Sequence, residues 1–313
     1  AEYNTAVDSN GYIHIVYVMK NYGSSGDSVR YVTNQSGSWQ SVLIEESVGS
    51  MSSIALDSND NVHIAYFAKR DSSGNTYSNN EHALKYATNQ NGSWAISIIE
   101  TGIDNRNADI NLESSKKFIA IDSNDKVHIA FSESFDDEGI KIANNTDGNW
   151  TVSTVNATTN DIANQVVLAI DSNDGLHLVW ETYKSVGWPP TYVVEVVHST
   201  NQSGTWSSSL IDVIDPLAGV EPLYIPQGST VVDSNDNLHF LKFRFNKYNN
   251  SDELQYRVIH YTLENGSWTN STLLHSYCRQ TYYGSSSTYV TDYCNLVAVI
   301  DSNDVIHITH EIS

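Results

Sequence analysis

The sequence predicts an all-β fold: a β-propeller of six blades in which the sixth blade is incomplete and has only strands A and B. Two hairpin motifs that alternate along the 313 residues carry this prediction. The first consists of strand A, an Asp-Ser-Asn turn and strand B with a histidine near its start. The second consists of strand C, a turn that ends in Gly-x-Trp, and strand D. Repeats of four short strands separated by turns are typical of propeller blades.

The first motif occurs six times, and its turn can be derived in detail. Pairing Ala55 with His63 keeps both residues on one face and leaves Ser58, Asn59 and Asp60 as a three-residue loop. Such a loop needs a left-handed residue at its end. That place is taken in the six repeats by Gly11, Asp60, Asp125, Asp174, Asp236 and Asp304. The aspartate that leads each turn can cap it by accepting backbone N–H groups.

Each copy of the first motif also has a histidine on strand B. These histidines are His14, His63, His128, His177, His239 and His307. A residue that recurs in every blade normally serves every blade, so we expect them to bond the capped turn or a backbone carbonyl. A metal or catalytic role and a pH-sensing role are the alternatives. The turns offer too few oxygens for a full cation site, so no metal and no cofactor is expected, with calcium at these turns as the alternative.

The second motif occurs five times, and its turn runs from Thr88 to Trp94 in the second repeat. This turn resembles the Asp-box turn of sialidase-type (BNR-repeat) propellers, whose pattern is Ser-x-Asp-x-Gly-x-Thr-Trp between the third and fourth strands of a blade. The chain keeps a hydroxyl residue, the glycine and the tryptophan, but its turn is one residue shorter and lacks the aspartate. The resemblance covers nearly the whole chain at the level of architecture. We expect the tryptophans to wedge between blades: Trp39, Trp94, Trp150, Trp206 and Trp268.

The chain is expected to form one domain, residues 1–313. Its blades are expected at about 1–48, 49–100, 115–156, 165–212, 228–274 and 295–313, the last of them partial. If both turn types lie on one face of the disc, the long insertions lie on the opposite face. These insertions are 69–82, 101–117, 183–193, 212–229 and 274–294. Variable loops on a repeated scaffold commonly carry function, so this insertion face is the expected binding face.

The insertion face is rich in aromatic residues, which suit the recognition of sugars or proteins. The candidate ligand-binding residues are Tyr77, His82, Arg106, Tyr183, Trp188, Tyr192, Tyr224, Arg279, Tyr282 and Tyr283. We therefore expect an extracellular, non-catalytic propeller that binds a glycan or a surface protein. The first alternative is a structural subunit of an extracellular filament, sheath or surface layer. The second alternative is a glycoside hydrolase or polysaccharide lyase.

The resemblance to sialidases implies three arginines that clamp a carboxylate, a Tyr–Glu nucleophilic pair and an acidic aspartate. Arg70, Arg106 and Arg279 fall in the insertions, but no assembled nucleophile–base pattern stands out. Arg30 and Arg257, which we place at equivalent points of their C strands, are expected to decorate strands. For a propeller-fold polysaccharide lyase that uses His and Tyr, the candidates are His82, Tyr77, Tyr282 and Tyr283.

Composition restricts the partners and the location. Acidic residues outnumber basic ones 37 to 16, for a net charge of −21, so nucleic acid is an improbable partner. No apolar run is long enough for a transmembrane helix, and insertion into a membrane is not expected. The start at Ala1, without methionine, suits an exported chain outside the cell or at its surface, and a fragment of a longer chain is the alternative. A disulfide between Cys278 and Cys294 is then expected, with two free thiols as the alternative.

Nine N-x-S/T triplets are candidates for glycosylation: Asn34, Asn91, Asn144, Asn149, Asn156, Asn201, Asn249, Asn265 and Asn270. We place four of them, Asn34, Asn91, Asn201 and Asn265, at the same turn of different repeats.

The sixth repeat has an A–B hairpin but no C–D hairpin before Ser313. Three outcomes are open. The chain continues past Ser313, the sixth blade stays two-stranded, or another chain supplies its outer strands by self-association at the unpaired edge.

Overall fold

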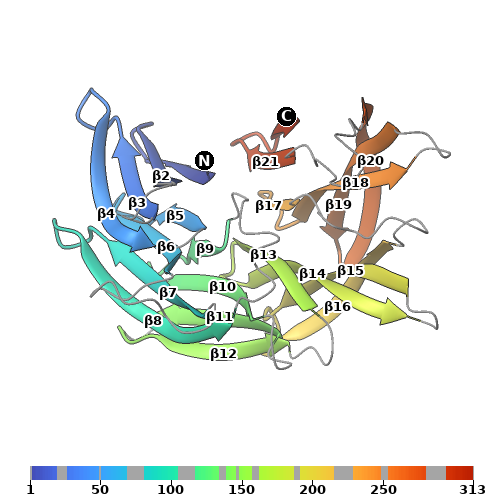
Figure 1. The fold of residues 1–313 in the computed structure, drawn as a ribbon, viewed down its shortest axis with the longest axis horizontal. Coiled ribbons are helices and arrows are strands. Elements are labelled where there is room, and N and C mark those ends of the chain that lie inside the picture. Colours follow the sequence, from blue (N-terminus) through green and yellow to red (C-terminus); the bar gives the residue numbers. More distant parts are fainter. Residues whose placement is uncertain are drawn as a thin grey trace, which may run out of the picture.

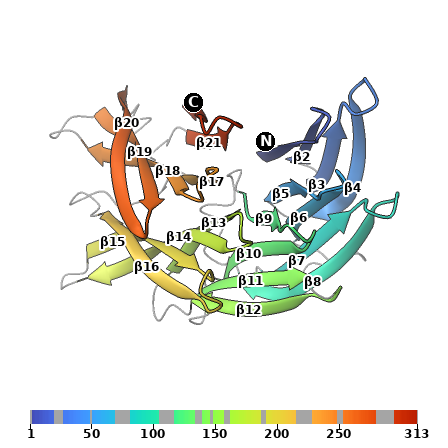
Figure 2. The ribbon, with the colours of Figure 1, turned by 180° about the vertical axis from the view of Figure 1, so that it is seen from behind.

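The structure is a computed structural model. It describes residues 2–19, 27–48, 51–68, 81–104, 117–133, 139–145, 148–156, 162–186, 191–214, 228–247, 253–279 and 294–312. Every regular element within these residues is a strand, and neighbouring strands pair antiparallel in five four-stranded sheets and one two-stranded sheet. The predicted all-β fold is therefore confirmed. The sheets follow one another in chain order around an arc, and the first and last sheets lie opposite each other at its opening (Figure 1, Figure 2).

Each sheet is called a blade below, numbered in chain order. Blade one consists of β1 (Glu2–Val7), β2 (Ile13–Met19), β3 (Asp27–Thr33) and β4 (Gln40–Val48). Blade two consists of β5 (Ser52–Leu56), β6 (Val62–Ala68), β7 (Glu81–Thr88) and β8 (Ala95–Asp104). Blade three consists of β9 (Ile119–Ile121), β10 (Val127–Glu133), β11 (Gly139–Asn145) and β12 (Thr151–Asn156).

Blade four consists of β13 (Ile162–Ile170), β14 (Leu176–Val186), β15 (Thr191–Thr200) and β16 (Ser207–Ile214). Blade five consists of β17 (Gly228–Val232), β18 (Leu238–Lys247), β19 (Glu253–Glu264) and β20 (Ser267–Arg279). Blade six has only β21 (Cys294–Ile300) and β22 (Ile306–Ile312) within the described residues.

The predicted first turn has the predicted geometry. Ala55 pairs with His63, and the N–H of Asp57 donates to the carbonyl of Asn61 at 3.1 Å. Asp60 closes the loop with a φ of 61°, and Gly11 takes the same place in blade one with a φ of 83°. Only the left-handed region fits here, and Asp and Gly are the residues that tolerate it.

Pairing continues farther into the insertions than the sequence suggests. The hairpin of β14 and β15 extends into the segment 183–193, where Tyr183 pairs with Val194 and Tyr192 pairs with Ser185. The expectation of a loop at these two tyrosines is wrong, because the β-forming run from Tyr192 to Val197 continues the ladder. β20 likewise carries Cys278 and Arg279 on a strand rather than in a loop.

The core lies between blades, because each apolar cluster joins side chains from two neighbouring sheets. Four tryptophans wedge there as predicted, each against the preceding blade. Trp94 packs on Tyr31, Trp150 on Tyr86 and Trp268 on His198, with ring centroids 5.2, 5.0 and 5.4 Å apart, while Trp206 joins the cluster of blades three and four.

Trp39 is the exception to the predicted wedge, because it is 55% exposed. The physical reason is its neighbour. A tryptophan of this motif packs on strand C of the preceding blade, and for Trp39 that blade is blade six, whose described residues include no strand C.

Candidate functional site

The two turn types of a blade lie side by side, as expected. The side-chain oxygen that opens the second turn accepts the backbone N–H that starts strand B. This contact joins Ile13 N to Asn34 Oδ1 at 2.7 Å, Val62 N to Asn89 Oδ1 at 2.7 Å and Leu176 N to Asn201 Oδ1 at 2.8 Å. The turns therefore share one face, and the insertions leave from the opposite ends of the strands.

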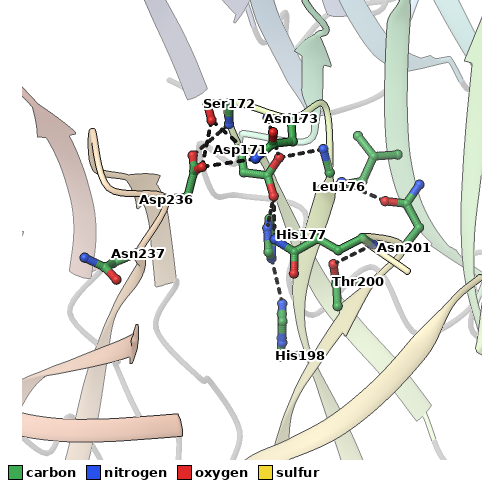
Figure 3. A network of polar contacts seen from close by, with 12 residues as sticks. Asp171, Ser172, Asn173, Leu176, His177, His198, Thr200, Asn201, Asp236 and Asn237 are labelled. Atoms are coloured by element: carbon green, nitrogen blue, oxygen red, sulfur yellow. Dashed lines mark hydrogen bonds and ion pairs between the residues drawn. The ribbon is translucent and has the colours of Figure 1, made fainter. Parts of the chain in front are cut away.

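On the turn face, neighbouring blades are joined by a repeated contact that we call the latch. The serine of one turn donates its backbone N–H and its hydroxyl to the left-handed aspartate of the next blade. Ser58 donates in this way to Asp125 at 2.8 and 2.7 Å, and Figure 3 shows Ser172 reaching Asp236. The remaining latches are Ser9 to Asp60, Ser123 to Asp174 and Ser234 to Asp304. These aspartates thus have a structural task besides their backbone conformation.

The latch should contribute measurably to stability. We expect Asp125→Gly to lower the free energy of unfolding by about 1–2 kcal/mol, because two hydrogen bonds to a carboxylate are lost at an exposed site while the left-handed backbone is kept. Urea unfolding followed by circular dichroism measures this loss. Ser302→Ala is the matched control: Gly11 offers Ser302 no carboxylate, so no loss is expected. Equal losses in the two variants would contradict the role of the latch.

Beneath the first turn of each of blades one to five lies a covered Asp–His relay, whereas the same pair in blade six is exposed. In blade four, His177 Nε2 lies 3.2 Å from Asp171 Oδ2, and His177 Nδ1 lies 3.0 Å from His198 Nε2 (Figure 3). In blades one and two a tyrosine takes the place of His198: Tyr31 contacts His14 and Tyr86 contacts His63, each at 2.5 Å. The expectation that the motif histidines bond the capped turn is confirmed.

The protonation of the relay follows from its surroundings. Burial acts to raise the pKa of Asp171, but hydrogen bonds from Gln202, Gly175 and His177 outweigh it and hold this pKa below the ordinary value. Burial, and then the neighbouring His177, lower the pKa of His198 to about 3. The carboxylate is therefore ionised and His198 is neutral near pH 7. His177 donates its Nε2–H to Asp171 and accepts at Nδ1.

In blades one, two and four this relay has the residue types of a catalytic pair, but its burial keeps a substrate away from it. His14, His63 and His177 are 0%, 1% and 1% exposed. The leading carboxylates are also engaged: Asp57 Oδ1 accepts the backbone N–H groups of Asn59 and Asn61 at 2.9 and 2.8 Å. Among the described residues, no group of three or more His, Cys, Asp or Glu side chains is placed to hold a metal.

Toward the insertion face, the blades are joined by buried charges that the sequence analysis did not identify. Lys85 Nζ and Tyr66 Oη both donate to Glu45 of blade one, each at 2.7 Å. Lys242 of blade five donates to Glu181 of blade four, with side chains 1% and 4% exposed. The sequence did contain a signal for the Lys242 ion pair, because a lysine replaces an aromatic residue at one strand B position. Lys242 occupies the position that holds Tyr17, Tyr66, Phe131 and Trp180 in the other complete blades.

Tyr66 and Glu45 are the residue types of a sialidase nucleophilic pair, but they do not form one. Tyr66 is 0% exposed, and burial, followed by the charge of Glu45, raises its pKa far above the ordinary value. An inaccessible phenol that resists ionisation is a poor nucleophile. The Tyr261 hydroxyl donates to Asp212 of blade four at 2.6 Å in the same manner, which indicates that both pairs tie blades together.

Few of the predicted ligand-binding residues lie among the described residues. His82 lies at the insertion-face end of β7, where it pairs with Ile103 and is 2% exposed. Arg279 pairs with Glu253, and for Arg279, Tyr183, Tyr192, Cys278 and Cys294 only the strand position is described, so the disulfide stays a prediction. The others lie outside the described residues: Tyr77, Arg106, Trp188, Tyr224, Tyr282 and Tyr283, together with Arg70.

The four sequons expected at the same turn, Asn34, Asn91, Asn201 and Asn265, all lie in the second turn of their blades, but not at one position within it. Asn34 and Asn201 open the second turn and accept a backbone N–H, but in blade two Asn89 does this and Asn91 follows two residues later. Asn265 sits at a left-handed position, with a φ of 50°. Asn144, Asn149, Asn156 and Asn270 lie among the described residues, and Asn249 lies outside them.

Arg30 and Arg257 occupy different points of their C strands. Arg30 pairs with Tyr17, three residues after the strand B histidine, whereas Arg257 pairs with Arg244, five residues after it. Their expected equivalence is therefore wrong by two residues. No helix long and apolar enough to cross a membrane occurs among the described residues.

Solved structures of similar fold are known, although no protein-family model and no curated protein sequence matches the chain. A polysaccharide lyase of family PL25, an ulvan lyase bound to a GlcA-Rha3S saccharide, is similar over 99% of this chain and 76% of its own, with a TM-score of 0.56 and 11% identity. The NanB sialidase from Streptococcus pneumoniae is similar over 100% of this chain and 65% of its own, with a TM-score of 0.55 and 10% identity. An α-L-arabinofuranosidase from Fusarium graminearum is similar over 97% of this chain and 85% of its own, with a TM-score of 0.53 and 11% identity.

These comparisons show a β-propeller fold and an architecture like that of sialidases and other glycan-related propellers. They also correct the expected function. The similar structures are mainly enzymes that act on glycans, which contradicts the leading expectation of a non-catalytic binding protein and agrees better with its second alternative. At 10–12% identity, the likeness establishes the fold and not the reaction. The chain is therefore, by its fold, a β-propeller of the architecture found in sialidases and polysaccharide lyases.

Proposed function

We propose that the chain is a glycan-active enzyme that cleaves glycosidic linkages on the insertion face. The observation that carries the proposal is the similarity, over 97–100% of the chain, to three enzymes that act on glycans. The turn face is a poorer place for a glycan site, because the serines and aspartates of its latches already bond one another. This supports placing the site on the insertion face. Export from the cell is part of the proposal, because polymeric glycans are met there.

His82 is the proposed proton-transferring residue. It lies at the insertion-face end of β7, five residues after Tyr77 in the sequence. Because His82 is 2% exposed, this role requires that substrate binding uncovers its imidazole. In a uronic acid polymer, a base removes the proton on C5, a double bond forms between C4 and C5, and the C4–O bond breaks as its oxygen gains a proton. Imidazole and phenol groups suit these two proton transfers. In a hydrolase, water would instead be added across the linkage.

The first experiment offers the full-length chain a panel of uronate-containing and neutral polysaccharides. New reducing ends are expected with at least one of them. An unsaturated product that absorbs ultraviolet light identifies elimination, and its absence together with new reducing ends identifies hydrolysis. If no polysaccharide in a broad panel is cleaved, the proposed function is wrong.

The second experiment tests the residue. His82→Gln is expected to lower kcat/KM by about 100-fold or more, the usual contribution of a general acid or base. Tyr12→Ala, on the turn face and 37% exposed, is the control and should keep full activity. A thermal melt of each variant shows whether the fold is kept. Full activity in a folded His82→Gln protein would remove His82 from the mechanism without affecting the proposed class.

A further inference from the structure

The junction between blades four and five differs from the other three junctions that a wedging tryptophan crosses. At each of the four, one residue of strand C bonds the motif histidine of its own blade. This residue is Tyr31 in blade one, Tyr86 in blade two, Asn144 in blade three and His198 in blade four. Tyrosine and asparagine do not gain a proton in mild acid, whereas histidine does. Of these four residues, only His198 can therefore respond to acid.

His198 is enclosed between a ring of its own blade and a ring of the next blade. Its Nε2 lies 3.0 Å from Nδ1 of His177, and its ring centroid lies 5.4 Å from that of Trp268, with the ring planes at 77° (Figure 3 shows the two histidines). His198 is 4% exposed. A proton on His198 would place a positive charge out of contact with water and beside a second imidazole. The closed junction therefore disfavours the protonated form.

The carboxylates around this stack do not offset such a charge. Asp171 lies 3.2 Å from the far nitrogen of His177, and Asp236 of blade five accepts the latch. The other carboxylates of the junction also have partners, Glu181 with Lys242 and Asp212 with the hydroxyl of Tyr261. Burial, followed by the neighbouring His177, accordingly lowers the pKa of His198 to about 3.

The same junction has the smallest apolar core among the described residues. Its cluster holds eight buried residues, whereas the clusters of the three preceding junctions hold eleven, eleven and ten. Its buried ion pair adds little net stability, because Oε2 of Glu181 has no hydrogen-bond partner among the described residues. At the junction of blades one and two, by contrast, Glu45 receives both Lys85 and Tyr66. We therefore expect the junction of blades four and five to open most readily.

We propose that the junction between blades four and five is a proton-operated opening, at which mild acid releases blade five from blade four. Opening lifts Trp268 from His198 and gives its imidazole access to water, so that His198 takes up a proton. The protonated ring then opposes closure. The opening is confined to this junction, because the corresponding residues of blades one to three do not titrate in this range. The proposal does not depend on the enzymatic function.

The size of the effect follows from the proton balance. The pKa of His198 is about 3 when the junction is closed and returns toward the ordinary histidine value near 6.5 when it is open. The open form therefore binds a proton that the closed form does not, and acid favours opening. Between pH 7 and pH 5, His198 alone is expected to raise the ratio of open to closed junctions about 25-fold.

Hydrogen exchange followed by mass spectrometry at pH 7 and pH 5 tests the opening on the full-length chain. After correction for intrinsic exchange rates, the protection of β18 and β19 in blade five should fall about 25-fold. The protection of β6 and β7 in blade two should fall much less. His198→Tyr and His198→Asn, which imitate blades one and three, should each abolish the excess loss in blade five. Two different replacements separate the loss of titration from any change in packing.

A transfer of the acid sensitivity is the second test. Tyr86→His places a histidine between His63 and Trp150, where the tyrosine now contacts both. At pH 5 this variant should lose protection in β6 and β7 as well. A thermal melt at pH 7 shows whether the variant folds, and if it does not, the two His198 variants decide alone.

Three results would overturn the proposal. An equal loss of protection in blades two and five of the parent would mean that acid acts on the whole chain. An excess loss in blade five that persists in both His198 variants would assign the sensitivity to another group. A folded Tyr86→His protein without new sensitivity would show that a covered histidine does not open a junction.

Discussion

Replacing Lys242 with methionine is expected to lower the free energy of unfolding by about 3–5 kcal/mol, because it leaves a carboxylate buried without its cation. Glu181 receives the Lys242 ammonium at Oε1, and its Oε2 has no hydrogen-bond partner among the described residues. With the Glu181 side chain 4% exposed, water cannot replace the lost cation without opening the junction of blades four and five. Urea unfolding at pH 7 measures the loss.

Two further variants test the cause. Lys242→Met combined with Glu181→Leu should recover most of the loss, since an apolar pair of similar volume often replaces a buried ion pair at little cost. Lys184→Met is the matched control: Lys184 lies 3.4 Å from Glu195 in the same blade, its side chain is 45% exposed, and about 1 kcal/mol or less should be lost. If the double variant is as unstable as Lys242→Met alone, the buried charge is not the cause.

His198→Tyr is expected to make the protein more resistant to acid. The pKa of His198 is about 3 in the folded chain and near 6.5 in the unfolded chain. Between these pH values the unfolded chain binds a proton that the folded chain does not, so stability is lost as the pH falls. The loss from this one group amounts to about 1.4 kcal/mol per pH unit. Tyrosine does not titrate there, so the variant avoids this part of the loss.

The substitution imitates the other blades, which gives it a structural precedent. Tyr86 bonds His63 Nδ1 at 2.5 Å and packs under Trp150, so a tyrosine fits between a motif histidine and a wedging tryptophan. We expect the variant to match the parent at pH 7 and to exceed its unfolding free energy at pH 4 by about 2–3 kcal/mol.

The difference between two proteins is the quantity to measure, because other groups act in the same direction. The pKa of Asp171 lies below its ordinary value, and burial lowers the pKa of His63, His177 and His260, so the parent and the variant both lose stability in acid. Urea unfolding at pH 7 and pH 4 separates the His198 contribution. His307→Gln, at an exposed histidine, is the control and should follow the parent. Identical curves for His198→Tyr and the parent would show that His198 does not set the acid sensitivity.

Much of the repeated scaffold could be predicted, because each repeated feature is a local one. The left-handed position of Asp60 follows from a three-residue loop, and the pairing of Ala55 with His63 follows from the alternation of faces. The wedge of Trp94 follows from its place in every second turn. These features depend on a few neighbouring residues, and five or six copies of the sequence repeat the same information.

The ties between blades could not be predicted, because their partners come from different repeats. Glu45 meets Lys85 from the next blade, and Ser58 meets Asp125 from a turn 67 residues away. Nothing in a single repeat says which serine meets which aspartate. The leading expectation of function was wrong for the opposite reason: the insertions do not repeat, and a single residue such as His82, although named as a lyase candidate, has no spacing pattern that would favour catalysis over binding.

The latches all point the same way around the arc, each blade holding the one that follows it, and the series has a beginning and an end. A closed ring of latches would couple every blade to two others, but among the described residues the latches form a linear series from blade one to blade six. In such a series an opening at one end need not spread to the other, since each blade transmits strain only to its neighbours. An opening of blade one can then leave the distant blades in place, because only blade two is latched to it among the described residues.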